Sequence, residues 1–161
     1  MDALQPLRDE HRALLPHVER LRELADRIGD LAPDDLARAV ADAHDFLADH
    51  LMRHAEAEEE VLYPAVGRAL GAAAATATMS RDHAEVARLT GELGRLRDRR
   101  DYPHDEQRTL RRVLYGLYAL LCVHFAKEEE VYVPLLEQSL GPQEAERILA
   151  DMARAAHTDG A

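Results

Sequence analysis

The chain has 161 residues, the length of a single domain that can bury its own hydrophobic core. Its formal net charge of −11 at pH 7 argues against nucleic acid or an anionic membrane surface as a partner. Two Phe, five Tyr and no Trp accompany abundant Ala, Leu, Arg and Glu, a composition that favours helix over sheet. The single cysteine, Cys122, excludes an internal disulfide and fits a reducing compartment. Neither a charged-then-apolar leader nor a bilayer-length apolar run is visible, so we expect a cytoplasmic protein.

Helical spacing of apolar residues predicts four long segments and a shorter fifth. They cover approximately residues 4–28, 33–70, 76–100, 106–140 and 143–156. Gly29 and Gly71 end the first two segments, and Pro64 and Pro134 predict bends in the second and fourth. Pro16 lies within the first segment and predicts a kink or a later start.

Short connections between the four long segments favour antiparallel neighbours. The predicted fold is therefore all-α, an up-down-up-down antiparallel four-helix bundle with a short extra C-terminal helix. Residues 1–141 are expected to form the bundle. Residues 142–161 are expected to form a helix and tail that pack on or beside the bundle or join a dimer.

An internal repeat relates the second segment to the fourth. Residues 54–64 (HAEAEEEVLYP) and residues 124–134 (HFAKEEEVYVP) are identical at six of eleven positions and lie 70 residues apart. His11 and His83 lie 72 residues apart, each early in the segment that precedes one copy of the repeat. Two helix pairs that contribute similar residues predict a bundle with pseudo-two-fold symmetry.

Each copy of the repeat carries a histidine and a glutamate four residues apart, which places the two side chains on one helix face. Both pairs fall on apolar stripes that should face the core, and Val131 and Tyr132 continue the second stripe. Burying carboxylates and imidazoles together costs several kcal/mol for each uncompensated charge, and a shared cation removes that cost. The predicted metal ligands are His11, His54, Glu58, His83, His124 and Glu128.

The ligand types indicate which metal is expected. If each carboxylate bridges two ions, each ion receives about four protein bonds and keeps positions open for solvent and an exogenous ligand. Mixed nitrogen and oxygen ligands with open positions favour redox iron, with manganese and zinc as alternatives, whereas calcium prefers oxygen alone.

The order of one histidine, a His-x-x-x-Glu pair, a second histidine and a second such pair resembles the hemerythrin-like, or HHE cation-binding, family. The likeness covers roughly residues 4–140 and includes the flanking EEEVLYP and EEEVYVP. It implies a four-helix bundle with a non-haem di-iron centre, bridged by oxo or hydroxo. It also implies that the four histidines are terminal ligands and that Glu58 and Glu128 bridge the two irons.

Two departures from the oxygen-carrying hemerythrins disfavour reversible oxygen carriage. Those proteins have a further ligand histidine where this chain has Ala87, and a longer His-to-Asp spacing where it has His124 and Glu128. Ferritin-like Glu-x-x-His pairs are absent from the sequence. The chain looks more like the HHE proteins associated with iron, peroxide or NO handling, and this resemblance implies a protein that binds and reacts with peroxide, O2 or NO in oxidative or nitrosative stress. The alternatives are a non-catalytic iron or oxygen sensor or store, and a bundle that binds zinc or no metal.

Two further residues are candidate catalytic groups. His50 lies one turn before His54 and could hydrogen-bond a ligand or replace one, although a histidine in the core or at its rim is the alternative. Tyr132 lies one turn past Glu128 and could donate to the cluster or bind metal, although a packed core tyrosine is the alternative. The expected partners are small molecules alone, with neither nucleic acid nor membrane, and the protein is expected to be a monomer or homodimer. We expect a solvated acidic face, with one more carboxylate ligand as the alternative, from Glu59, Glu60, Glu129 and Glu130. We expect surface positions for His17, His44, His104 and His157.

Overall fold

The computed structural model describes residues 4–157, and within that range every regular element is helical. The elements comprise α-helices (α) and single π-helical turns (η). They are α1 (Gln5–Arg27), α2 (Pro33–Phe46), η1 (Leu47–Leu51), α3 (Met52–Ala57), η2 (Glu58–Leu62), α4 (Tyr63–Leu70), α5 (Ala77–Gly94), α6 (His104–Lys127), η3 (Glu128–Tyr132), α7 (Val133–Ser139) and α8 (Pro142–Ala155). The predicted all-α class is confirmed.

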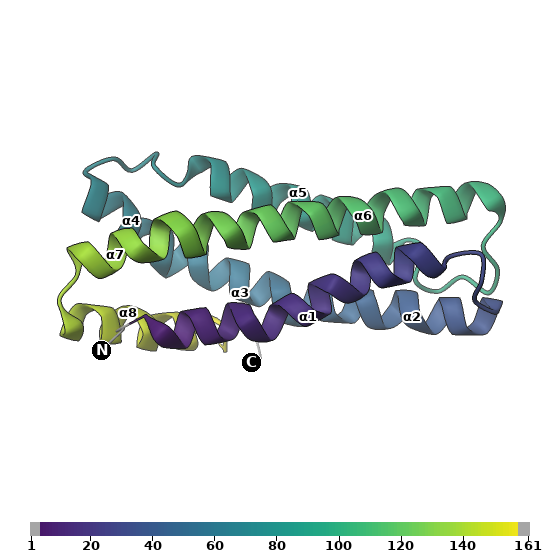
Figure 1. Cartoon of the computed structure of the whole chain (residues 1–161), viewed down its shortest axis with the longest axis horizontal. Helices are drawn as coiled ribbons and strands as arrows, with labels where there is room; N and C mark the ends of the chain where they lie inside the picture. Colours follow the sequence, from purple (N-terminus) through teal and green to yellow (C-terminus); the bar gives the residue numbers. More distant parts are fainter. Residues whose placement is uncertain (1–3, 158–161) are drawn as a thin grey trace.

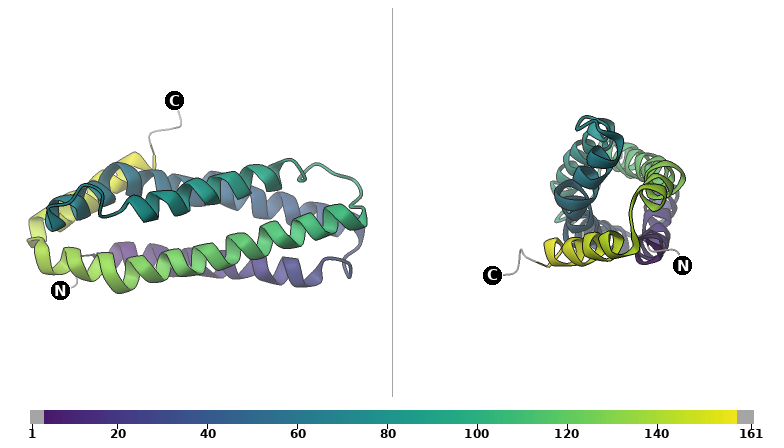
Figure 2. Two further views of the ribbon diagram at one scale, coloured as in Figure 1. Left: turned by 90° about the horizontal axis from the view of Figure 1, so that it is seen from above. Right: turned by 90° about the vertical axis from the view of Figure 1, so that its left-hand side faces the viewer.

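Long helical rods run side by side along the molecule (Figure 1). The first rod is α1, the second runs from α2 through α4, the third is α5, and the fourth runs from α6 through α7. In Figure 1 the chain reverses direction between successive rods. The end-on view of Figure 2 shows the rods around a common axis, with α8 against one side. None of the helices over residues 4–157 is both long and apolar enough to cross a membrane.

Two of the π turns begin at the glutamates of the repeat. η2 starts at Glu58 and η3 at Glu128, and each glutamate carbonyl accepts a hydrogen bond from the amide five residues later. Pro64 and Pro134 follow directly in the first turn of α4 and α7, where a missing amide proton costs little. The rods therefore accommodate both prolines without a break, and α1 likewise continues through Pro16.

Helix ends follow the glycines in three places. Gly29 follows α1 with φ +101°, and Gly71 caps α4 in the left-handed conformation with φ +63°. The third rod ends at Gly94, whereas the sequence pattern predicted that this helix would continue to about residue 100. There the backbone lies against His44, and a β-carbon on Gly94 would come within 2.8 Å of the His44 ring.

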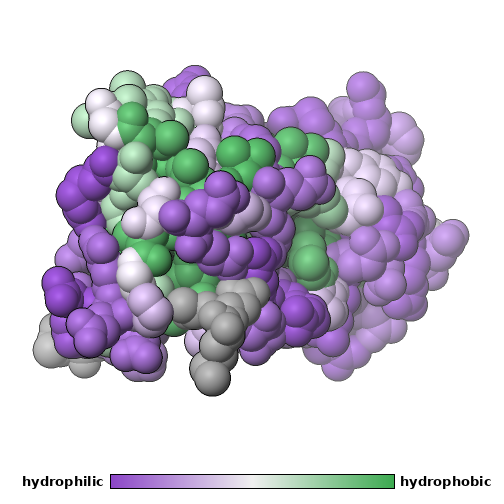
Figure 3. All heavy atoms as spheres, turned by 60° about the vertical axis from the view of Figure 1, so that its left-hand side comes forward, coloured by the Kyte–Doolittle hydropathy of each residue, from purple (hydrophilic) through white to green (hydrophobic). Residues whose placement is uncertain are grey.

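Two hydrophobic clusters make up the core, and every rod contributes to both. The larger cluster includes Val18, Leu47 and Leu117. The smaller one includes Leu7 and Leu62, together with the inner face of α8, which packs on η2 and α3. Figure 3 shows apolar residues reaching the surface near this end, within a mostly hydrophilic surround. Among the described residues, the large apolar side chains classed as exposed are Leu15, Leu70, Tyr115, Val123 and Val131.

Replacing two glycines by alanine should change stability in opposite directions. A β-carbon meets nothing within 4 Å at either Gly71 or Gly91, so backbone conformation decides. Gly71→Ala should lower the free energy of unfolding by about 1 kcal/mol, because alanine is strained at positive φ. Gly91→Ala, inside α5, should raise it by about 0.5–1 kcal/mol. Urea denaturation measures both, and shifts of the same sign would contradict this account.

Candidate metal centre

The structure brings all six sequence-predicted metal ligands into one buried cluster between the two hydrophobic clusters. They are His11 from α1, His54 from α3, Glu58 from η2, His83 from α5, His124 from α6 and Glu128 from η3. Both glutamates are fully buried, and none of the four histidines is more than 8% exposed. On each rod, therefore, the cluster residues lie between the apolar residues that belong to one hydrophobic cluster and those that belong to the other.

Glu58 lies between two pairs of imidazoles. Its Oε1 is 2.9 Å from Nε2 of His54 and 3.5 Å from Nε2 of His11. Its Oε2 is 3.2 Å from Nε2 of His83 and 4.0 Å from Nε2 of His124. Glu128 also spans the two pairs, with Oε2 3.6 Å from His11 and Oε1 3.4 Å from His124. Each carboxylate thus turns one oxygen toward each histidine pair.

The donor atoms form two groups small enough to hold one ion each. His11, His54, Glu58 and Glu128 make up the first group, and Glu58, His83 and His124 make up the second. Within each group all donor atoms lie within 4.8 Å of one another. Because Glu58 belongs to both groups, the cluster fits two adjacent cations with a shared carboxylate.

Several of these donor atoms are buried without a hydrogen-bond partner. They are Nε2 of His11, Nε2 of His54, both oxygens of Glu58 and Oε2 of Glu128. A buried polar atom that lacks a partner costs about 1–3 kcal/mol, and folded proteins rarely tolerate several in one place. Bound cations would satisfy all of them at once, so the residues present fit a metal.

Each of the four cluster histidines pairs its other ring nitrogen, Nδ1, with a carboxylate from a neighbouring rod. The Nδ1 to oxygen distances are 2.6 Å for His11 and Glu129, 3.0 Å for His54 and Glu10, 2.8 Å for His83 and Glu59, and 3.2 Å for His124 and Asp82. When Nδ1–H donates to the carboxylate, the Nε2 lone pair faces the cluster. Proteins commonly orient metal-binding imidazoles in this way.

The four carboxylates form a closed ring around the bundle. Glu10 of the first rod reaches the second, Glu59 of the second reaches the third, Asp82 of the third reaches the fourth, and Glu129 of the fourth returns to the first. Each of these acids is the sequence neighbour of a ligand on its own rod. Three of them are held from outside as well, Glu129 by Arg8, Glu59 by Ser80 and Asp82 by Lys127. We refer to these four acids as the carboxylate ring.

The cluster carries compensating charges when it holds protons in place of metal. Burial disfavours a charged His54, yet the Glu58 carboxylate and the hydrogen bond with Glu10 raise the pKa of His54 well above its usual value. Burial likewise opposes charge on His124, but Glu128 and Glu58 raise its pKa to about 10. Glu58 itself is fully buried, yet the facing imidazoles hold its pKa well below the usual range. Metal binding must therefore displace protons from these rings.

Tyr63 is a site residue that the sequence pattern did not reveal. Its hydroxyl donates to Oε1 of Glu128 at 2.8 Å, and its ring stacks on His83 with centroids 5.4 Å apart. Burial and the nearby Glu58 and Glu128 carboxylates raise the pKa of Tyr63, which keeps the hydroxyl protonated as a donor. The π turn explains the miss. It brings the fifth residue past Glu58 inward, whereas α-helical spacing pointed to the fourth.

The two candidate catalytic residues of the sequence analysis do not join the cluster. Tyr132 is half-buried and donates to the carbonyl oxygen of Ala75 at 3.2 Å. It is the fourth residue past Glu128, and the π turn there directs the fifth residue into the core instead. His50 is exposed and lies edge-on to Phe46. Val131 was also expected to face the core, but it lies in the same π turn as Tyr132 and is 54% exposed.

The remaining sequence expectations concern surface residues. His104 and His157 are exposed, whereas His17 and His44 are half-buried. Glu60 and Glu130 are exposed.

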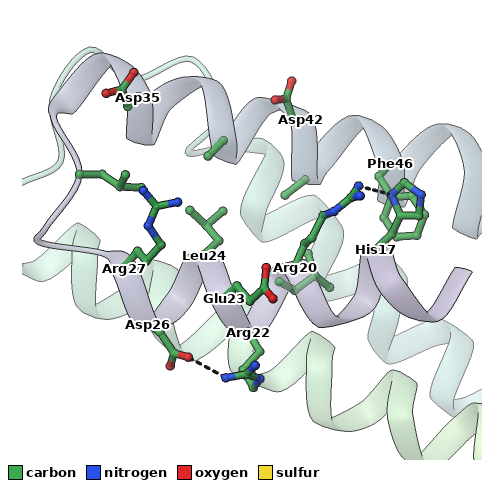
Figure 4. Close-up of a pocket in the computed structure, with 14 residues that line it drawn as sticks. His17, Arg20, Arg22, Glu23, Leu24, Asp26, Arg27, Asp35, Asp42 and Phe46 are labelled. Carbon is green, nitrogen blue, oxygen red and sulfur yellow. Dashed lines mark hydrogen bonds and ion pairs between the residues drawn. The ribbon is translucent and has the colours of Figure 1, made fainter.

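A larger pocket lies away from the cluster, between α1 and α2. This groove has a volume of about 820 Å³, and none of the six cluster residues lines it. Figure 4 shows side chains of both charge signs around it, with Arg22 paired to Asp26 and Arg20 to His17. Among residues 4–157, neither group of side chains that could hold a metal ion lies in this groove.

A small enclosed cavity adjoins the cluster itself. Its free volume of about 10 Å³ is roughly that of one water-sized molecule. Leu51, Val86, Leu121 and Phe125 form its apolar wall, and Glu58 borders it. A ligand larger than a few atoms has no room there.

This protein is a helical bundle with a buried cluster of His and Glu side chains that could hold cations. These features place it in the class of all-helical proteins with a candidate metal site. The family model described as the hemerythrin HHE cation-binding domain matches residues 2–157. The chain therefore belongs to this family, which confirms the resemblance seen in the sequence. Comparison with curated proteins and with solved structures found no match.

The carboxylate ring should govern metal affinity. Glu129→Gln keeps the size of the side chain but weakens the acceptor that orients His11, so metal affinity should fall by about 10-fold or more. Glu130→Gln makes the same charge change one residue further on, at an exposed position, and should leave affinity within about 2-fold. Competition with a coloured chelator measures the metal affinity of both variants. Equal losses of affinity would mean that net charge alone explains the effect.

Proposed function

We propose that the protein holds two iron ions in the buried cluster and uses them to bind and react with a small oxidant, namely peroxide, O2 or NO. The observation that carries this proposal is the pair of donor groups that share Glu58, with several buried donor atoms that lack any other partner. Membership of a cation-binding family supports the same conclusion.

The donor chemistry supports iron. Four imidazole nitrogens and two carboxylates match the ligand preference of iron, manganese and zinc, and exclude a calcium site, which would use oxygen ligands throughout. Iron bound there would supply redox chemistry and open positions for an exogenous ligand.

Residues of the chain itself would restrict and organise that chemistry. The apolar wall formed by Leu51, Val86, Leu121 and Phe125 keeps bulk water from the cluster, and the small free volume selects small ligands. Tyr63 acts as a positioning residue, because its hydroxyl fixes one oxygen of Glu128. The hydroxyl oxygen also lies 3.4 Å from Nε2 of both His83 and His124.

A specific observation favours one second candidate, a non-catalytic sensor. The helix α8 packs directly on η2, the turn that begins at the cluster residue Glu58. A change in the metal state at Glu58 could therefore alter how α8 is held. In that case, metal removal would change α8 while turnover stayed negligible.

Metal analysis tests the proposed centre. We expect aerobically purified protein to contain about two irons per chain, with ligand-to-iron charge-transfer absorption in the near ultraviolet and visible. Glu58→Ala, Glu128→Ala should lose both the metal and the absorption, because each carboxylate contacts both histidine pairs. Fewer than one metal per chain in the wild-type protein, after growth with added iron, would refute both the oxidant-reacting and the sensor functions.

Consumption of peroxide separates the two functions. The iron-loaded wild-type protein should consume peroxide at least about 10-fold faster than Glu58→Ala, Glu128→Ala, because the reaction needs the bound iron. Wild-type protein treated with a chelator provides a matched control with an unchanged sequence. Equal rates in all three samples would remove the enzymatic function. The same comparison with NO in place of peroxide tests whether the protein consumes NO.

A further inference from the structure

An open cleft lies on the surface directly outside His83, between α3, η2, α5 and the end of α8. Its volume is about 450 Å³. The residues around it are Met52, Ala55, Glu56, Glu59, Glu60, His83 and Ala155. Three of these are carboxylates and none is a lysine or arginine, so the cleft has a negative lining.

The cleft and the enclosed cavity beside the cluster share two walls. Ala55 and His83 line both spaces, so these two side chains form the partition between solvent and the cavity. At the inner end is Glu58, which is fully buried and whose two oxygens face imidazoles but have no hydrogen-bond partner. His83 is also the least buried ligand, with 9% of its side chain exposed against 4% or less for the other three.

The way His83 is held makes it suited to act as a gate. Oε1 of Glu59 accepts from Nδ1 of His83 at 2.8 Å, and Oε2 of Glu59 accepts from Ser80 at 2.7 Å. Glu59 is 40% exposed and lines the cleft, so the same carboxylate faces both solvent and the gate. A cation that binds Glu59 from the cleft competes with the His83 ring for that carboxylate and frees the ring to turn aside.

We propose that this cleft is the site where a divalent cation first binds, and that the cation then passes between Ala55 and His83 to reach Glu58. The proposal rests on the proposed metal-binding function and adds the route of loading. The acidic lining favours a cation over a neutral oxidant as the species that uses it. The groove of Figure 4, by contrast, is lined by arginines as well as acids and reaches no cluster residue.

Neutralising the mouth of the cleft should slow uptake of metal without changing how much is bound. Glu56 and Glu60 are exposed and lie outside the cluster and the carboxylate ring. With metal-free protein and Co²⁺ alone as the probe, stopped-flow absorbance should show uptake about 3- to 10-fold slower in Glu56→Gln, Glu60→Gln at low ionic strength. The difference should shrink to less than about 2-fold in 0.5 M salt, because salt screens the attraction.

The matched control removes the same charge elsewhere. Glu23→Gln, Asp42→Asn neutralises two exposed acids at the groove of Figure 4 and should take up Co²⁺ at the wild-type rate. Equal slowing in the two double variants would overturn the proposal, since net charge would then explain the effect.

Narrowing the partition gives a second, independent variant. Ala55→Leu adds bulk between the cleft and the cavity, so Co²⁺ uptake should slow by more than about 10-fold at every salt concentration, with unchanged final stoichiometry. Ala43→Leu, in the groove of Figure 4, is the control for added bulk. The charge variants alter only exposed side chains, so they test the route even if Ala55→Leu folds poorly.

The outcomes distinguish this proposal from the function on which it rests. If wild-type protein binds no Co²⁺ or iron, the metal-binding function itself is wrong. If it binds metal but both Ala55→Leu and the Glu56 and Glu60 variant load at the wild-type rate, the route is wrong and the function stands. Slower peroxide consumption by loaded Ala55→Leu with unchanged metal uptake would assign the passage to the oxidant and overturn the proposal.

Discussion

Six buried ionisable side chains cross the middle of this bundle, and the remaining architecture depends on how their charge is compensated. The two apolar clusters on either side cannot supply that compensation, because a hydrocarbon surface offers no hydrogen bonds. Imidazolium and carboxylate groups neutralise each other in part, but several donor atoms still lack partners. Bound cations would satisfy these atoms and complete the polar layer between the two apolar clusters. Folding stability and metal binding are therefore coupled in this fold.

The carboxylate ring shows how four rods can fix one site. Each rod carries a ligand and an adjacent acid, and the acid serves the histidine of the next rod. The orientation of every imidazole therefore depends on the position of a neighbouring rod. Glu59 illustrates the consequence, because it orients His83 and also lines the cleft through which we propose that metal enters. Under this proposal, metal affinity and metal access would depend on the same side chain.

Much of the site could be read from the sequence because its spacing is local. His54 and Glu58, four residues apart, must share a face wherever the chain is helical, and apolar neighbours on that face predict burial. The same reasoning missed Tyr63 and misplaced Tyr132, because the π turn at each glutamate brings the fifth residue past it into the core. Past Glu58 the fourth residue, Leu62, is buried as well. A proline shortly after each glutamate is the sequence signal that could have indicated these turns.

The sequence by itself determined the helical class and the six residues that could bind metal, because periodicity and composition are properties of single segments. The order of its His and His-x-x-x-Glu motifs gave the resemblance to the family that the family model confirmed. Tertiary structure alone decided which acid supports which histidine, that Tyr63 contacts Glu128, and that the cluster lies one side chain away from an acidic cleft. These contacts join residues on different rods. Their partners depend on how the rods rotate and pack against one another, which no single segment specifies.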